Sequence, residues 1–149
     1  MLDFLRREGI DPGIISAIEE FRAAHSVAGE AQRRVTESPR FEYYGKEIWE
    51  AAATALLCGE NLLLVGPKNV LAECLAAAFG RPSWDISFYI NTDSASLIGT
   101  DTFKNGEVTF RAGPITQCAE LGGFGILDEI NMAKNESLAV LHATLDFRR

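Results

Sequence analysis

The most constraining feature of the sequence is a very short connection between an apolar run and a helix. Residues 61–65 read Asn-Leu-Leu-Leu-Val, and a helical pattern begins at Val70. We expect 61–65 to form a strand that is buried on both faces of a parallel sheet. A phosphate-binding loop follows such a strand, and its pattern G-x-x-x-x-G-K-[ST] spans eight positions. The connection Gly66-Pro67-Lys68-Asn69 supplies four of them, so four are missing.

The missing residues matter because a phosphate loop works through its backbone. Successive N–H groups converge on the phosphates, the following helix adds its positive end, and a lysine reaches the outer phosphate. Pro67 has no N–H group to donate. The sequence leaves open which lysine of a longer loop Lys68 represents, because two different four-residue deletions leave the same letters. Taken alone, Gly66-Pro67-Lys68 is also an ordinary turn between a strand and a helix.

A second motif lies some sixty residues further along the chain. Residues 124–127 are apolar and predict a buried strand, which ends in Asp128 and Glu129. The first acid of such a pair can join the shell of a Mg²⁺ ion, and the second can polarise an attacking water. A strand end followed by a helix cap would give the same letters. The two motifs together predict a nucleotide site.

The remaining pattern alternates strands with helices, which indicates an α/β fold with a mainly parallel sheet. In the helix expected from Lys46 to Cys58, Ile48 and Trp49 should face the core. Asn105-Gly106 between two alternating segments predicts a β-hairpin. The other expected elements are helices over 2–7, 14–35, 70–79, 114–121 and 134–145, a short helix capped at 92–94, strands over 84–88 and 124–127, and hairpin strands over 100–104 and 107–111.

Composition narrows the classes of partner. The chain has 149 residues and a net charge of −7, and this balance argues against nucleic acid or anionic lipid as a partner, because both require clustered cations. No apolar run approaches the roughly 18 residues of a membrane span. The N-terminus mixes acidic and basic residues without an apolar signal core, so we expect a cytoplasmic location.

Several segments together resemble AAA+ ATPases of the MoxR and dynein-related group. They are Gly-Glu-Asn-Leu-Leu-Leu-Val-Gly-Pro, Leu97-Ile98-Gly99, the hairpin leading to Arg111-Ala-Gly-Pro114, and Ile126-Leu-Asp-Glu-Ile-Asn-Met-Ala133. The resemblance covers roughly residues 41–149, which predicts a partial nucleotide-binding core over 41–149 and an N-terminal helical segment over 1–40. In that group a hairpin interrupts the helix after the second strand, and this matches residues 100–111.

The resemblance implies ATP and Mg²⁺ as cofactors and assigns roles to individual residues. Asp128 would be the magnesium-associated acid, Glu129 the base that activates water, and Asn131 part of the adjacent polar shell. Tyr44-Gly45 matches the stretch that often lies near adenine. The sequence departs from the family at the shortened loop and at Asn69, which stands where Ser or Thr would offer Mg²⁺ a hydroxyl.

Two functions follow from the resemblance. In the first, the chain is an ATP-binding module that remodels or activates a partner protein, commonly as a homo-oligomer, here with an impaired phosphate loop and expected to hydrolyse ATP poorly or not at all. In the second, it is a non-catalytic interaction domain that keeps the α/β frame.

The resemblance also implies a gap in the sheet. The family places its fourth strand between the first and third, and this chain ends at Arg149 before that strand or the sensor strand, arginine finger and helical lid appear. We therefore expect 61–65 to associate with other chains, to leave the chain marginally stable, or to lie directly beside 124–127.

Overall fold

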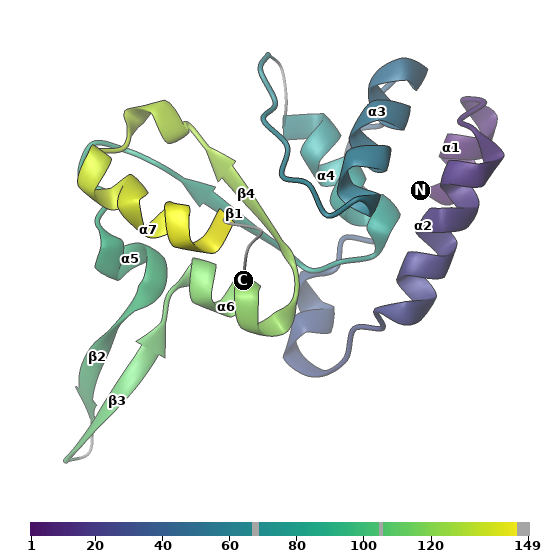
Figure 1. The fold of residues 1–149 in the computed structure, drawn as a ribbon. Coiled ribbons are helices and arrows are strands. Elements are labelled where there is room, and N and C mark those ends of the chain that lie inside the picture. Colours follow the sequence, from purple (N-terminus) through teal and green to yellow (C-terminus); the bar gives the residue numbers. More distant parts are fainter. Residues whose placement is uncertain (67–68, 105, 146–149) are drawn as a thin grey trace. The chain divides into compact units, whose positions relative to one another are not determined.

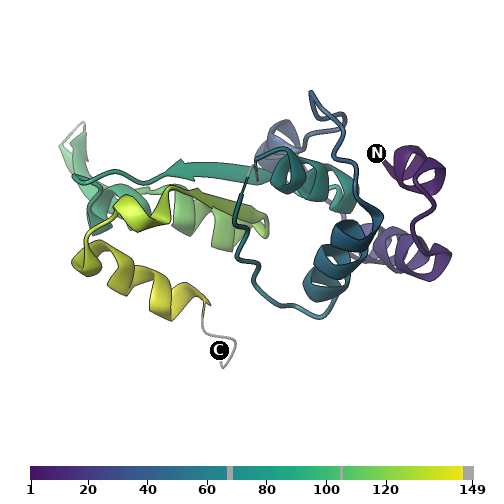
Figure 2. The same cartoon turned by 90° about the horizontal axis from the view of Figure 1, so that it is seen from above.

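The computed structural model describes residues 1–66, 69–104 and 106–145. It divides into two compact units, Met1–Pro82 and Ser83–Arg149, and each unit is described by itself. Figures 1 and 2 show the elements of both units from two sides. The division of the sequence into 1–40 and 41–149 is an expectation from family resemblance and stays a prediction.

The first unit is helical. Its elements are α1 (Leu2–Arg7), α2 (Pro12–Ala24), the 3₁₀ turn η1 (Gly29–Arg34), α3 (Lys46–Leu57) and α4 (Asn69–Phe79). Helix α2 packs against α1, α3 and α4. The fully buried side chains at the centre include Trp49, Phe79, Ile18 and Cys74. Helix α3 matches the expected bounds closely, but Ile48 is 48% exposed instead of buried.

The helix that the sequence predicts over 14–35 ends at Ala24, so its second half is wrong. His25 already has non-helical backbone angles, and its carbonyl accepts a 2.6 Å hydrogen bond from Nη1 of the buried Arg81. Gly29 then has φ of +66°, which belongs to the left-handed region and cannot continue an α-helix. Arg81 thus binds the carbonyl at the end of α2, where a cation also suits the helix dipole.

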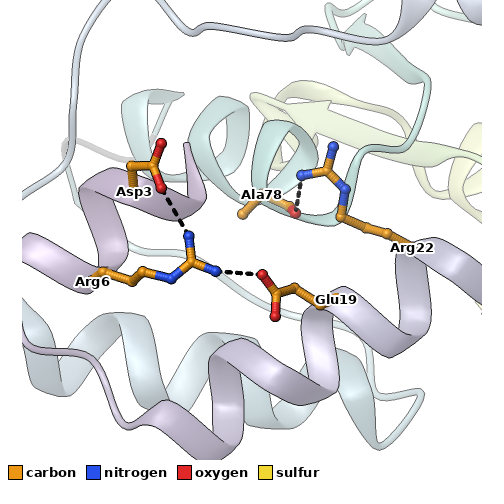
Figure 3. A network of polar contacts seen from close by, with 5 residues as sticks. All are labelled: Asp3, Arg6, Glu19, Arg22 and Ala78. Carbon is orange, nitrogen blue, oxygen red and sulfur yellow. Dashed lines mark hydrogen bonds and ion pairs between the residues drawn. The ribbon is translucent and has the colours of Figure 1, made fainter.

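Polar contacts join three helices of this unit (Figure 3). Arg6 of α1 forms ion pairs with Asp3, at 2.8 Å, and with Glu19 of α2. Arg22 of α2 donates a 3.4 Å hydrogen bond to the Ala78 carbonyl near the end of α4. The N-terminal helices are therefore held against α4, the helix that follows the shortened loop.

The strand predicted over 61–65 is wrong. The segment is assigned to no strand, and Leu63 and Val65 are 82% and 91% exposed. Leu62 and Leu64 are half-buried, so the side chains still alternate as in an extended chain. A strand needs neighbours for its N–H and C=O groups, and no described segment forms a ladder with 62–65.

The second unit contains a parallel strand pair with helices packed on it. Strand β1 (Ser83–Ser87) pairs with β4 (Phe124–Asp128), with Ser83 opposite Phe124 and Ser87 opposite Asp128. Helices α5 (Ser94–Ile98), α6 (Pro114–Leu121) and α7 (Asn135–Leu145) follow the expected bounds closely. The core of this unit consists of Trp84, Ile86, Phe88, Leu97, Ile115 and Leu141. The fold is thus α/β, with a short parallel sheet and helices, consistent with an incomplete P-loop NTPase-like fold.

A β-hairpin extends away from this core between α5 and α6 (Figure 1). It consists of β2 (Gly99–Lys104) and β3 (Glu107–Ala112), paired antiparallel as the sequence predicts. Its base is closed by two 2.7 Å bonds to the Ile98 carbonyl, from Gly113 N–H and from the Thr116 hydroxyl. The hairpin therefore lies between α5 and α6 and is joined to both helices at its base. In the described part of the chain, no helix is long and apolar enough to cross a membrane.

We predict that residues 62–65 drive weak self-association, because an exposed apolar segment that joins no described ladder can pair with another chain. Replacing both Leu63 and Val65 with Lys should suppress the association without loss of thermal stability, since both side chains are exposed. Sedimentation velocity over a range of concentrations measures the effect. Ile48→Lys is the matched control, because Ile48 is an exposed apolar residue on a helix. A parent chain that stays monomeric at every concentration and melts cooperatively would contradict the prediction.

Candidate functional site

The acidic half of the expected site lies at the carboxyl edge of the β1–β4 pair. Asp128 is the last residue of β4, and its carbonyl accepts a 2.9 Å hydrogen bond from Phe88 N–H, which extends the ladder past the end of β1. The Asp128 side chain is half-buried, and its Oδ1 accepts a 3.0 Å bond from Glu129 N–H. This is the place that the sequence predicts for the acid, since parallel strands bring their carboxyl ends to one edge.

Glu129 has an unusual backbone. Its φ of 53° and ψ of 37° lie in the left-handed region, and it is the one non-glycine residue with positive φ in the described ranges. Such a conformation is strained for a side chain of this kind and persists where the surroundings impose it, often at functional sites. Glu129 is exposed and precedes the 3₁₀ turn η2 (Ile130–Met132), on which Asn131 is exposed too. The two acids are thus adjacent, with Glu129 open to solvent.

The loop after β1 is fixed beside this edge by a buried bond that the sequence did not reveal. Ser137 of α7 donates a 2.5 Å hydrogen bond to the Thr92 carbonyl, and both residues are about 95% buried, with exposures of 5% and 4%. Asp93 then caps α5 by accepting from Ser96 N–H, as expected from the sequence, and these bonds lower the pKa of its carboxyl. No sequence signal distinguishes Ser137 from other small polar residues on a helix.

The described residues of the second unit do not form a metal site by themselves. No group of three or more His, Cys, Asp or Glu side chains in the described ranges could hold a metal ion. Mg²⁺ is commonly held by one or two carboxylates together with water and substrate phosphates. Asp128 with Glu129 therefore fits the protein's share of such an ion, and a bound phosphate would have to supply the rest.

The phosphate half of the expected site lies in the first unit. Gly66 is exposed with φ of +125°, and α4 begins at Asn69. Pro67 and Lys68 lie outside the described residues, and the Asn69 side chain is not described either. Between Val65 and α4 the chain therefore has three residues, one of which has no N–H. This connection does not fit a cradle that surrounds phosphate oxygens with several backbone donors.

The stretch before α3, expected near adenine, is anchored from two helices. Trp49 of α3 donates a 2.8 Å hydrogen bond to the Tyr43 carbonyl, and the Cys74 thiol of α4 donates to the Phe41 carbonyl at 3.2 Å. Burial raises the pKa of Cys74, so the thiol stays protonated and can donate. Gly45 has φ of +142°, and a Cβ there would lie 3.3 Å from the Tyr43 ring, so glycine is required before α3.

Tyr44 itself projects to the surface. Its ring is 66% exposed, and its hydroxyl donates a 3.2 Å hydrogen bond to Oε2 of Glu42. This bond, together with the negative charge of Glu42, raises the pKa of the Tyr44 hydroxyl. The structure therefore brings Tyr44 and Gly45 into the same unit as Gly66 and Asn69, and it brings Asp128, Glu129 and Asn131 together in the other unit.

We predict that the backbone of residue 129 prefers glycine. Glu129→Gly should be more stable to urea than Glu129→Ala by about 1 kcal/mol, because the left-handed conformation costs a residue with a Cβ roughly that much. At Ala51, an exposed position within α3, the order should reverse, since glycine destabilises a helix by about 1 kcal/mol relative to alanine. Equal or greater stability of Glu129→Ala would show that the backbone of residue 129 is not left-handed.

One known protein family matches a stretch of the chain that includes both the short connection 66–69 and the strand that ends at Asp128. The sequence model of the AAA domain (dynein-related subfamily) matches residues 61–149. The uncharacterized protein YojN of Bacillus subtilis (strain 168) is 40% identical over 117 residues, which are 73% of this chain and 38% of that protein. An uncharacterized protein of Staphylococcus saprophyticus is 36% identical over 111 residues, 68% of this chain and 42% of its own length. The chain thus spans about two fifths of the length of these relatives.

Proposed function

The chain belongs to the dynein-related subfamily of AAA proteins, and from this membership we propose that it is a nucleotide-binding module that remodels or activates a partner protein. A homo-oligomeric assembly is part of the proposal. The cofactors would be ATP and Mg²⁺, with a binding strength reduced by the short phosphate loop. The proposal rests on the family match together with the position of Asp128 and Glu129 at the end of β4.

The proposed roles of the acidic residues come from the family resemblance, and their positions in the structure are compatible with those roles. Asp128 would face the Mg²⁺ shell from the sheet edge, where its carboxylate is held by Glu129 N–H at 3.0 Å. Glu129 would accept a proton from an attacking water, since its side chain is exposed, and Asn131 would add a polar group beside it. ATP–Mg²⁺, when bound, supplies the phosphoryl group and the charge that neutralises it. Because the loop 66–69 does not fit the phosphates, we expect this role of Glu129 to be unused in the chain as it stands.

A second function, a non-catalytic interaction domain, is favoured by the hairpin. Phe103 lies opposite Val108 in the β2–β3 register, and Phe110 is two residues further along the same face. These side chains are 76%, 68% and 56% exposed. An exposed apolar face of this kind commonly marks a protein interaction site. Replacing Phe103 and Phe110 with Ser should abolish partner binding in this case, while nucleotide affinity stays unchanged.

We expect that lengthening the phosphate loop restores ATP binding. Each charge-assisted hydrogen bond contributes about 1.5–3 kcal/mol, so the loss of several donors should remove saturable ATP–Mg²⁺ binding at micromolar concentration. Insertion of Gly-Thr-Gly-Lys after Lys68 should recover part of it. Calorimetry on the parent and the inserted chain measures both, and insertion of Gly-Ser-Gly-Ser at the same place is the control for loop length alone. Tight ATP binding by the parent chain would contradict the proposal.

Hydrolysis should be absent from the parent chain. Alignment of phosphates, metal and water supplies most of the barrier reduction in phosphoryl transfer, and a shortened loop cannot align them. We expect phosphate release at the background rate, unchanged by Glu129→Gln, in a coupled assay with millimolar ATP–Mg²⁺. A measurable turnover in the parent that Glu129→Gln abolishes would show that the loop is functional despite its length.

A further inference from the structure

Helix α1 is too short to be stable by itself. It has six residues, and isolated helices shorter than about 12–15 residues are marginal in water. Two of its apolar side chains, Phe4 and Leu5, are buried, with exposures of 3% and 0%. Its ion pairs are made by Arg6 and Arg7, whose side chains are 49% and 65% exposed, and such surface pairs contribute little. Whether α1 stays docked on the first unit is therefore decided by tertiary contacts, of which the charged ones are weak.

The chain is anchored differently after Gly9. This glycine has φ of +70°, in the left-handed region that glycine adopts readily, and a Cβ there would meet no atom within 4 Å. Beyond it, Ile10 is 3% exposed, and the Asp11 N–H donates a 2.8 Å hydrogen bond to Oε1 of Glu50 on α3. The Asp11 side chain also caps α2 by accepting from Gly13 N–H at 2.7 Å. The chain beyond Gly9 is thus bound to two helices, and Gly9 is a suitable pivot for the helix before it.

Helix α1 contacts the stretch that leads into α3. Phe4 packs edge-on against Tyr44, with ring centres 5.3 Å apart. Nη2 of Arg7 lies 3.4 Å from Oε1 of Glu42, whose other oxygen accepts a 3.2 Å hydrogen bond from the Tyr44 hydroxyl. A cavity of about 440 Å³ adjoins these contacts, and its walls include Met1, residues 38–42 and Tyr44. Release of α1 would therefore break both contacts and remove the wall that Met1 supplies.

We propose that α1 is a latch, which detaches about Gly9 while the rest of the first unit stays folded, and that its detachment opens the cavity at residues 38–44. Local opening of this kind costs less than unfolding and begins where few apolar contacts are buried. The fully buried Ile18, Trp49 and Phe79 belong to α2, α3 and α4, so the centre of the unit remains when α1 leaves. The latch does not depend on which ligand the cavity takes, and it can therefore hold or fail separately from the proposed function.

Thiol labelling of the full chain tests the latch. Leu5→Cys places a thiol at a position of α1 with 0% exposure, and Ile18→Cys, the matched control, does the same on α2. The native thiols of Cys58, which is exposed, and Cys74, which is buried, give the fast and slow limits in the same sample. With iodoacetamide under native conditions, we expect the thiol at position 5 to react about tenfold faster than the one at position 18, because local opening is commoner than unfolding. It should still react more slowly than Cys58, and mass spectrometry of the labelled peptides assigns each rate.

Variants in the stretch 41–44 test whether α1 is held there. Tyr44→Ala should accelerate labelling at position 5 about two- to tenfold, the factor that an edge-on ring pair contributes, and Tyr44→Phe, which keeps the ring, should stay near the parent rate. Glu42→Gln should accelerate it up to about fivefold, because Arg7 loses its charged partner. Glu20→Gln is the control, since Glu20 is exposed on α2. Salt at about 1 M should act like Glu42→Gln, because it screens exposed charges. Labelling at position 18 should not respond to any of these changes.

Hydrogen exchange in the unsubstituted chain covers the case in which Leu5→Cys itself releases α1. The residues that end α1 and α3 offer a matched pair of amides: Glu8 N–H donates to the Phe4 carbonyl at 2.9 Å, and Cys58 N–H donates to the Thr54 carbonyl at 3.0 Å. We expect the Glu8 amide to exchange faster than the Cys58 amide. Its rate should depend little on urea at low concentration, because detachment of one short helix exposes little surface.

Three results would overturn the inference. Equal labelling at positions 5 and 18, with equal exchange of the Glu8 and Cys58 amides, would show that α1 opens only when the whole unit unfolds. Labelling at position 5 as fast as at Cys58, with an unprotected Glu8 amide, would show that α1 is not docked at all. Labelling at position 5 that ignores both Tyr44→Ala and Glu42→Gln would show that release of α1 is not coupled to the walls of the cavity.

Discussion

Several backbone N–H groups must converge to hold a phosphate, and the length of the chain between a strand and the next helix limits how many can do so. In this protein three residues separate Val65 from α4, and one of them is Pro67. The connection follows an apolar segment in which the side chains of Leu63 and Val65 are exposed. It leads directly into α4. The weak phosphate binding that we propose therefore follows from the length of the chain, before any other interaction is considered.

The acidic half of the expected site, at the edge of the β1–β4 pair, depends on a different set of interactions. The β1–β4 ladder brings Asp128 to the sheet edge, Phe88 extends the ladder by one bond, and Ser137 fixes the adjacent loop through the Thr92 carbonyl. The left-handed backbone of Glu129 is imposed at the same point. None of these contacts involves residues 66–69. The acidic edge is thus formed by contacts within the second unit, independently of the length of the connection 66–69.

Much of this fold could be predicted from local sequence. The Asn105-Gly106 turn predicted the hairpin, Asp93 predicted the cap of α5, and the apolar residues before Asp128 predicted a strand that ends in the acid pair, because each of these signals acts over a few residues. The strand prediction over 61–65 was wrong because a strand depends on neighbouring strands, which the segment itself does not contain. The helix prediction over 14–35 was wrong in its second half. The chain leaves the helix at His25, whose carbonyl binds Arg81, a residue 56 positions away.

The surroundings of Tyr44 show the same limit. Tyr44 is expected near adenine only from resemblance, and no local signal links it with Phe4, Arg7 or Cys74. Those contacts join α1 and α4 to one short stretch, and they arise from packing across more than thirty residues of sequence. The exposed aromatic cluster Phe-Glu-Tyr-Tyr at 41–44 was the available signal, because large rings at the surface commonly mark a binding site.

The most direct test of this account is to map which backbone amides respond to a nucleotide. In the ¹⁵N-labelled full-length chain titrated with ATP, we expect the amide resonances of residues 41–45 to shift, while those of Gly66, Lys68 and Asn69 stay near their original positions. Shifts that begin at Gly66, Lys68 and Asn69 and leave 41–45 unchanged would contradict it, because they would show that the short connection still binds phosphate.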